Sequence, residues 1–359
     1  MIDQARLTQD LEALWLRRQQ AALSRYCNRE TLAQLDQKLS LALRTRPQPD
    51  ASSDWLALVH DLWQAPSADI LFDYYMANPD KTLDWLAWRP IRCCFSTLKQ
   101  LWHSHEPERQ ALVLRVLARH GEEPINLELA PLCNDRIPPA LYPAVLDYIV
   151  HLRQNWAQDW LTSRLSTGDR HAAAAWLALN GPIVETSSPS TQESYTLAQS
   201  LLVSADIAWL KNAPYDALRV LFLSGTDRQL SLWINQFSRK DKELAMLAMG
   251  LSGRGRYIHW LTEVASTEAN MPYHGDALHL LTGWVPETAS NDLSDQLDEC
   301  SGDARLLGGQ PLIAGQLATP EDLSQHNRYQ WAWYQYWHGQ TQHFDDPRRF
   351  TPHLRRTCV

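Results

Sequence analysis

Three segments of this chain repeat one pattern, and that pattern restricts the fold more than any other feature of the sequence. Each segment contains Trp followed by an aliphatic residue (Trp160-Leu161, Trp233-Ile234 and Trp260-Leu261), has a polar turn about nine residues later, and ends in Leu-(Asn/Ser/Thr)-Gly. The segments are 160–181, 233–253 and 253–283. In the last one, Tyr257, Trp260, Leu261 and Val264 recur at offsets of three, four and seven. This spacing predicts a helix with an apolar stripe along one side.

The second half of segment 253–283 predicts another helix that packs on the first. Its apolar residues stop at Thr282-Gly283, where glycine can adopt the left-handed conformation that ends a helix. Two such short helices bury too little apolar surface to be stable alone, so each unit needs stacked neighbours. Weaker copies occur at 98–121, 127–153 and 197–224. A repeat of about thirty residues predicts an all-α fold, an α-solenoid of stacked helical hairpins. The alternative is that Leu-x-Gly ends unrelated helices by chance.

The flanking regions predict three parts: an N-terminal helical hairpin (1–46), the repeat solenoid (54–284), and an acidic loop with a C-terminal helical cap (285–359). In the first part, Asn28 is the expected cap between helices at 3–26 and about 30–45. Helices are also expected at about 54–64, 67–77 and 80–88. Thr319-Pro320-Glu321-Asp322 has the cap, proline and acid that open a helix, here through about Gly339.

Composition narrows the class of protein further. No apolar run approaches the ~18 residues of a membrane span, and no basic-then-apolar leader precedes them, so we expect a cytoplasmic protein. Six cysteines form no Cys-x-x-Cys pair, which indicates reduced and mostly buried thiols. The net charge of −8 predicts no general attraction to nucleic acid or to an anionic membrane.

Motifs for catalysis are weak. Gly253-Arg254-Gly255 lacks the following Gly-Lys-Ser/Thr of a phosphate loop, and an inter-hairpin turn explains it better. His103 and His105 would point about 200° apart on a helix, so a solvated helix end is favoured over a metal site. We therefore predict no catalytic residue, no metal and no cofactor.

A run of aromatic residues near the C-terminus is the strongest local anomaly. Tyr329, Trp333 and Trp337 share one helix face, whereas Trp331 falls on another side. Either this helix caps the solenoid and is covered on both sides, or part of it is an exposed anchor for a partner. Arginine and aromatic residues off the apolar stripes are the candidate partner-binding residues: Arg254, Arg256, His259, Arg328 and Trp331.

Three stretches resemble a family of bacterial HEAT-like repeat proteins that are often encoded beside type VI secretion genes. They are LEALWLRRQQAALSRYCNRETLAQLDQKLSLAL (11–43), LHLLTG (278–283) and GGQPLIAGQLATPEDL (308–323), followed by the aromatic helix. The resemblance implies an α-solenoid and a link to type VI secretion, and it supplies no catalytic residues. The chain departs from the family pattern at 122–150 and 182–215, where prolines and loops interrupt the repeat.

The function expected from these observations is non-catalytic protein binding. The chain would act as an adaptor or chaperone for a type VI secretion effector or spike component, or as the immunity protein of a toxin. A structural accessory role differs only in the partner. The alternative class is a HEAT-like-repeat DNA glycosylase, which would need a continuous cationic groove and a carboxylate within it.

Overall fold

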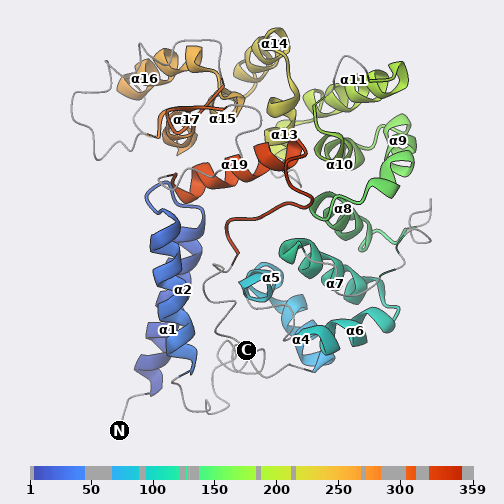
Figure 1. The fold of residues 1–359 in the computed structure, drawn as a ribbon, viewed down its shortest axis with the longest axis vertical. Helices are drawn as coiled ribbons and strands as arrows, with labels where there is room; N and C mark the ends of the chain where they lie inside the picture. The colour runs from blue at the N-terminus through green and yellow to red at the C-terminus, as the bar shows by residue number, and fades with distance from the viewer. Residues whose placement is uncertain are drawn as a thin grey trace. The chain divides into compact units, whose positions relative to one another are not determined.

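The computed structural model describes residues 4–44, 67–88, 94–121, 127, 129, 137–182, 187–211, 216–267, 272–283, 305–312 and 323–349. Within these ranges the chain is almost entirely α-helical, which confirms the all-α prediction, and one short β-hairpin is the exception. The chain forms two compact units (Figure 1). Unit 1 comprises Met1–Leu152 and Asp346–Val359, and unit 2 comprises Arg153–Asp345. The divisions predicted from the sequence, near 46–54 and at 284–285, stay predictions.

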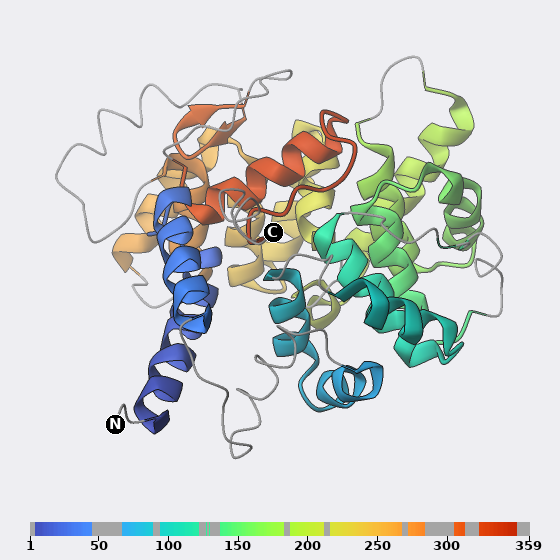
Figure 2. The same ribbon diagram turned by 60° about the horizontal axis from the view of Figure 1, so that its bottom comes forward.

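Unit 1 begins with the expected helical hairpin. Its helices are α1 (Gln4–Ala22), α2 (Arg29–Arg44), α4 (Ala68–Ala77), α5 (Pro79–Trp88), α6 (Phe95–His103), α7 (Pro107–His120) and α8 (Tyr142–His151). The long helices α1 and α2 pack side by side (Figure 2). The predicted cap is confirmed, because the Asn28 side-chain oxygen accepts a hydrogen bond from the backbone N–H of Thr31 at 2.9 Å. The expected helix at 54–64 lies outside the described residues.

Tryptophans join α1 to α5 in the core of unit 1. The ring of Trp15 meets those of Trp85 and Trp88 edge-on, with centroids 5.0 and 5.9 Å apart. Such edge-to-face pairs add to the stability gained from burying the rings. Of the six cysteines, Cys27 and Cys94 are described, and both are free thiols. None of the helices in the described ranges is long and apolar enough to cross a membrane.

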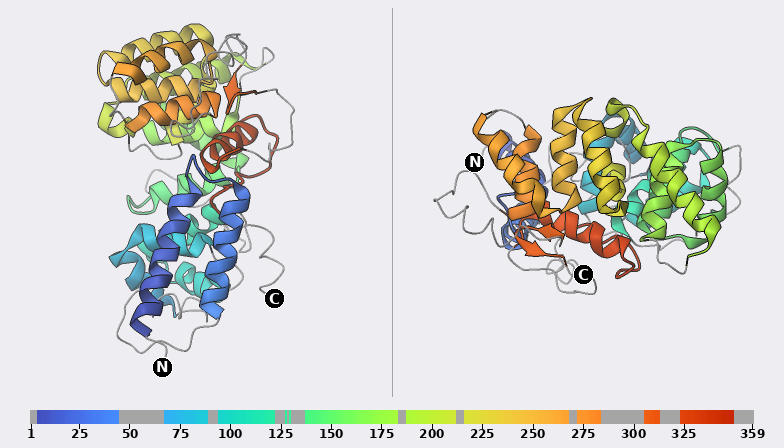
Figure 3. Two further views of the ribbon diagram at one scale, coloured as in Figure 1. Left: turned by 90° about the vertical axis from the view of Figure 1, so that its left-hand side faces the viewer. Right: turned by 90° about the horizontal axis from the view of Figure 1, so that it is seen from above.

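Unit 2 contains the repeated segments. Its helical elements are η3 (Asn155–Ala157), α9 (Gln158–Ser166), α10 (Arg170–Asn180), α11 (Pro189–Val203), α12 (Ile207–Lys211), α13 (Ala217–Ser224), α14 (Asp227–Ser238), α15 (Lys242–Ser252), η5 (Gly255–Tyr257), α16 (Ile258–Thr267) and α17 (Pro272–Thr282). The three sequence repeats therefore fold as the helix pairs α9/α10, α14/α15 and α16/α17, and the two helices of each pair pack against each other. The helices α10, α13, α15 and α17 also pack on one another in chain order (Figure 3).

In the Leu-x-Gly ends the residue before the glycine makes the same kind of contact, but the glycine conformations differ: ψ is −161° at Gly181 and 11° at Gly253, and φ is −79° at Gly225. Gly181, Gly253 and Gly283 all have positive φ, between 69° and 74°. The residue before each glycine turns back on its own helix: Asn180 donates to the Trp176 carbonyl, Ser252 to Met249 and Thr282 to Leu278, at 2.6–2.8 Å. A fourth copy, Leu223-Ser224-Gly225, ends α13, and the Ser224 hydroxyl donates to the Leu221 carbonyl at 2.7 Å.

The late part of unit 2 runs along these helix ends. It contains the strands β1 (Leu306–Leu307) and β2 (Gln310–Pro311), which pair antiparallel, and the helix α19 (Gln325–Trp337). The N–H groups of Leu306, Gly308 and Gly309 donate to the carbonyls of Gly253, Leu280 and Leu281 at 2.6–2.8 Å. These bonds satisfy carbonyls that a helix end otherwise leaves without partners.

The aromatic helix α19 is covered. It packs on α10, α13 and α17 (Figure 1), and the indole N–H of Trp337 donates to the Leu177 carbonyl at 3.1 Å. All its aromatic side chains are buried, including Trp331, which is 4% exposed. Of the two alternatives drawn from the sequence, the covered helix is the one observed. The expected cap at Thr319 lies outside the described residues, and Ser324 caps α19 instead.

Candidate functional site

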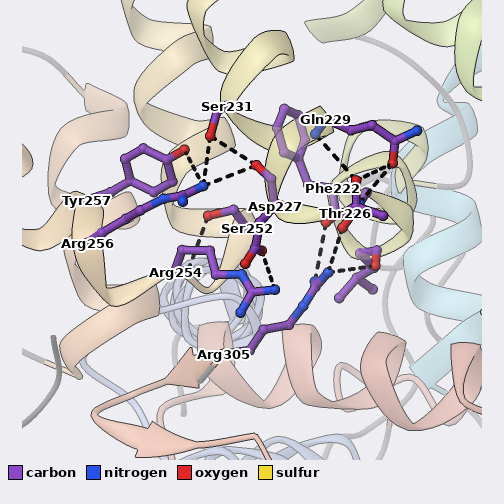
Figure 4. A network of polar contacts seen from close by, with 12 residues as sticks. Phe222, Thr226, Asp227, Gln229, Ser231, Ser252, Arg254, Arg256, Tyr257 and Arg305 are labelled. Atoms are coloured by element: carbon purple, nitrogen blue, oxygen red, sulfur yellow. Dashed lines mark hydrogen bonds and ion pairs between the residues drawn. The ribbon is translucent and has the colours of Figure 1, made fainter. Parts of the chain in front are cut away.

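The candidate site is the polar network where α13 meets α14 and α15 meets η5, and it contains two of the predicted residues (Figure 4). Its base is the start of α14. The Thr226 hydroxyl accepts from the Gln229 N–H, and the Gln229 side chain accepts from the Thr226 N–H at 2.9 Å, which is a capping box. This arrangement fixes Asp227 at the first position of the helix, where a carboxylate is favoured by the helix dipole.

Arg254 is held against Asp227. Its position follows from Gly253, whose left-handed conformation ends α15 and turns the chain toward α14. The backbone N–H of Arg254 donates to the Ser252 hydroxyl at 3.2 Å, and its guanidinium forms an ion pair with the Asp227 carboxylate at 2.5 Å. The Arg254 side chain is mostly buried, whereas the Asp227 side chain is 43% exposed, so solvent and salt partly screen this ion pair.

Arg256 lies over the outer side of the same helix. One of its terminal nitrogens donates to the Ser231 hydroxyl at 2.9 Å, and that nitrogen also lies 3.3 Å from the Asp227 carbonyl. The guanidinium stacks over the Tyr257 ring, 5.0 Å from its centroid, in a cation–π contact. Unlike Arg254, Arg256 is exposed, so its remaining donors face solvent.

Arg305 closes the network from the late segment. Its guanidinium donates to the carbonyls of Phe222, Leu223 and Gly225, at 3.3, 2.9 and 3.2 Å. Burial and the nearby Arg254 guanidinium lower the pKa of Arg305 to about 10, so it still carries its charge at neutral pH. A single cation thus satisfies the carbonyl end of α13.

The less exposed part of this network, Arg254 with Asp227 and Arg305 with three carbonyls, holds helices together, and we call it the clamp. Arg254 and Arg305 donate to a carboxylate and to backbone carbonyls, and these contacts fix the junctions of three helices. The exposed edge of the network, at Arg256, is the part that can meet another molecule. A search of the described residues finds no group of three His, Cys, Asp or Glu side chains placed to hold a metal ion.

The five predicted residues fall into two sets. The structure brings Arg254 and Arg256 together on Asp227 and leaves His259 exposed on α16. Arg328 and Trp331 lie on α19. Trp331 stacks on Tyr334 with ring centroids 5.9 Å apart and planes inclined by 20°. Trp331 is buried, which does not fit the prediction that it contacts a partner at the surface. The helices α10, α13 and α17 pack against α19.

Sequence analysis missed Asp227 and Arg305, the two residues that join the network to α14 and to the late segment. Asp227 had a local signal, since Thr226-Asp227-Arg228-Gln229 is a capping box after the glycine that ends α13. Arg305 had no local sequence signal, because its hydrogen-bond partners lie about eighty positions earlier in the chain.

Comparison with known proteins adds no identification. No family model matches the chain, and searches of curated proteins and of solved structures found no match.

Proposed function

We propose that this chain is a non-catalytic protein-binding scaffold in which a HEAT-like α-solenoid presents its outer helices to a protein partner. The order of packing in unit 2 supports the solenoid. Helix pairs follow one another along the chain, and α10, α13, α15 and α17 each pack on the next. Stacked hairpins of this kind bury one layer of helices and leave the faces of the other layer free to vary.

Exposed apolar side chains on the two helices next to Arg256, Trp260 on α16 and Leu232 on α14, carry the proposal, and we call these three residues the patch. Trp260 on α16 is 40% exposed, although its place in the apolar stripe predicted burial, and Leu232 on α14 is 59% exposed. Arg256 lies four positions before Trp260 and contacts Ser231, the neighbour of Leu232. Tryptophan and arginine are the residues that most often dominate binding energy at protein interfaces. The clamp beneath holds Arg256 in place, which lowers the entropy lost on binding.

The resemblance to a HEAT-like family encoded beside type VI secretion genes suggests the partner. We propose a secretion effector or spike component, held as by an adaptor, or a toxin that the chain neutralises as an immunity protein. The glycosylase alternative gains no support from the network, since Arg254 and Arg305 already bind a carboxylate and backbone carbonyls rather than facing a groove.

The first test is a pull-down of the tagged chain from its native cell. Bound proteins that withstand a wash at about 0.5 M salt, which screens loose charge contacts, are identified by mass spectrometry. We expect a stoichiometric secretion effector or spike protein. Recovery of nucleic acid alone would contradict the proposal. Protection of cells from a captured toxin would separate the immunity role from the adaptor role.

A matched pair of variants then tests the patch. Trp260→Ala should weaken the captured partner's binding at least about tenfold, which corresponds to roughly 1.4 kcal/mol. Trp156→Ala removes an equally exposed tryptophan (43%) from η3, elsewhere in the unit, and should leave the dissociation constant unchanged. Equal effects of the two variants would place the interface elsewhere.

A further inference from the structure

A cavity of about 250 Å³ lies within unit 1, apart from the network and the patch described above. Helices α1, α5 and α7 and the segment 346–349 line it. These elements carry all the charged side chains that line it: Arg18, Asp80, Asp84, Arg119, Asp346, Arg348 and Arg349. A volume of this size corresponds to about eight water molecules at ~30 Å³ each, which is room for a molecule the size of an amino acid.

Part of the charged lining forms a fixed wall. Arg18 is 2% exposed, and its guanidinium donates to the Asp36 carboxylate at 2.8 Å and to the Arg348 carbonyl at 2.6 Å. The Trp88 indole donates to the same Asp36 oxygen at 2.9 Å. Arg348 in turn grips the Asp346 carboxylate with two nitrogens, at 2.5–2.9 Å. Because these groups satisfy one another, they are set in place before any ligand arrives.

Asp84 and Arg119 are different. Both line the cavity, and neither side chain makes a hydrogen bond or ion pair within the part of the chain that the structure describes. The two side chains still interact electrostatically. Burial raises the pKa of Asp84 above its ordinary value, while the field of Arg119 opposes that rise most strongly among the neighbouring charges. Two opposite charges thus line the same cavity without forming an ion pair in the described part of the chain.

The charge balance of the lining selects the ligand. Four arginines and three aspartates, Asp80 included, face the cavity, and Asp36 behind Arg18 makes the balance even. A simple anion would be repelled by Asp84, and a simple cation by Arg119. We propose that this cavity binds a small zwitterion of amino-acid size, whose carboxylate is held by Arg119 and whose ammonium group is held by Asp84. The planar guanidinium suits a carboxylate, which it can bind through two parallel hydrogen bonds.

A series of ligands with increasing charge separation tests the proposal. Glycine, β-alanine, 4-aminobutyrate and 6-aminohexanoate are titrated into the full chain by calorimetry, with acetate and ethylammonium as single-charge controls. A built site prefers one separation, so one member should bind at least about tenfold more tightly than the weakest. Neither single-charge control should match the best zwitterion. Equal affinities across the series, an acetate response as large as the best zwitterion, or no binding below about 10 mM would overturn the proposal.

Three variants assign the two ends of the ligand. Arg119→Gln and Asp84→Asn should each lower the affinity for the best zwitterion by at least about tenfold, because each removes one charge contact. Arg115→Gln is the matched control, one turn earlier on α7, where Arg115 donates to the Tyr75 hydroxyl at 2.6 Å and lies outside the cavity lining. Circular dichroism confirms that each variant folds. If Arg119→Gln does not fold, Asp84→Asn alone decides, and unchanged affinity in a folded Asp84→Asn variant would refute the proposal. The patch at Trp260 lies in unit 2, so this result is independent of the partner-binding test.

Discussion

The late segments of the chain complete the two units by different means. In unit 2, residues 305–312 and α19 donate hydrogen bonds to backbone carbonyls at the ends of α10, α13, α15 and α17. In unit 1, the segment 346–349 enters a cluster of charged side chains that includes Arg18 and Arg119. Backbone acceptors are present whatever the sequence, so the first kind of closure depends on backbone shape. The second kind depends on a few side chains, each of which is costly to leave unpaired.

The largest effect is expected where backbone shape matters most, at Gly181. Its φ of 69° and ψ of −161° fall in a region that only glycine populates easily, and a Cβ there would overlap the Trp337 carbonyl. Gly181→Ala should therefore lower the free energy of unfolding by about 4 kcal/mol, measured by urea denaturation. Gly168→Ala is the control: its φ is 79°, but no atom lies within 4 Å of the added Cβ. The control should cost only about 1–2 kcal/mol. Similar losses in both variants would show that the approach of Trp337 adds nothing.

A somewhat smaller effect is expected from Arg305, whose side chain closes the end of α13. Arg305→Met removes the donor shared by three carbonyls at the end of α13, and the unfolding free energy should fall by about 3 kcal/mol. Arg305→Lys should recover part of this loss, since an ammonium group keeps the charge but cannot span the three acceptors as well. The exposed Arg256→Met should change stability by less than about 0.5 kcal/mol. If Arg256→Met cost as much as Arg305→Met, the clamp would not depend on burial.

The same distinction explains what the sequence could predict. Features that depend on residues close together in the sequence could be recognised from local spacing. These are the Leu-x-Gly helix ends, the Asn28 cap and the aromatic helix. The pairs Arg18–Asp36 and Trp88–Asp36 join positions 18 and 52 apart, and Arg18 meets Arg348 across 330 positions. Such contacts leave no local pattern. The sequence left the burial of Trp331 undecided for a related reason, because the helices that cover α19 lie far from it in the sequence.

In unit 1, removing the negative charge of the Asp346–Arg348 ion pair should lower the unfolding free energy by less than the two changes above. Burial alone would raise the pKa of Asp346, but Arg348, Arg349 and Arg119 together hold it well below its ordinary value of 3.8. Asp346→Asn should lower the unfolding free energy by about 2 kcal/mol at neutral pH. Because the pKa of Asp346 is held below its ordinary value, this difference should begin to shrink as the pH falls below about 4 and should disappear only at still lower pH, where the carboxylate of the folded protein takes up its proton. The exposed Asp10→Asn on α1 is the control and should change the unfolding free energy by less than about 0.5 kcal/mol at neutral pH. A loss that persists undiminished in acid would show that shape, not charge, is what Asp346 supplies.

The smallest effect is the pH dependence of wild-type stability, because two groups on α8 oppose each other. Burial raises the pKa of the Asp147 carboxyl to about 6, and Arg119 and Arg115 only partly counter it. Its contribution to stability is therefore largest in acid and is lost as the pH rises through 6. Burial lowers the pKa of His151 to about 4, although the Asp147 carbonyl, 2.8 Å from its Nδ1, favours the protonated ring. Its contribution is present above 6.5 and is lost as the pH falls toward 4.

Between about pH 7 and pH 5.5 these changes have opposite signs, and we expect the wild-type unfolding free energy to fall by less than about 1 kcal/mol. Asp147→Asn removes the group that gains in acid, so its stability should fall by about 1 kcal/mol over the same interval. His151→Gln removes the group that loses, so that variant should become more stable in acid than at neutral pH. Urea denaturation at the two pH values measures both slopes, and the double variant should show almost none. Parallel slopes in the wild type and both single variants would mean that these residues do not control the response, and that other charged groups of the chain must do so.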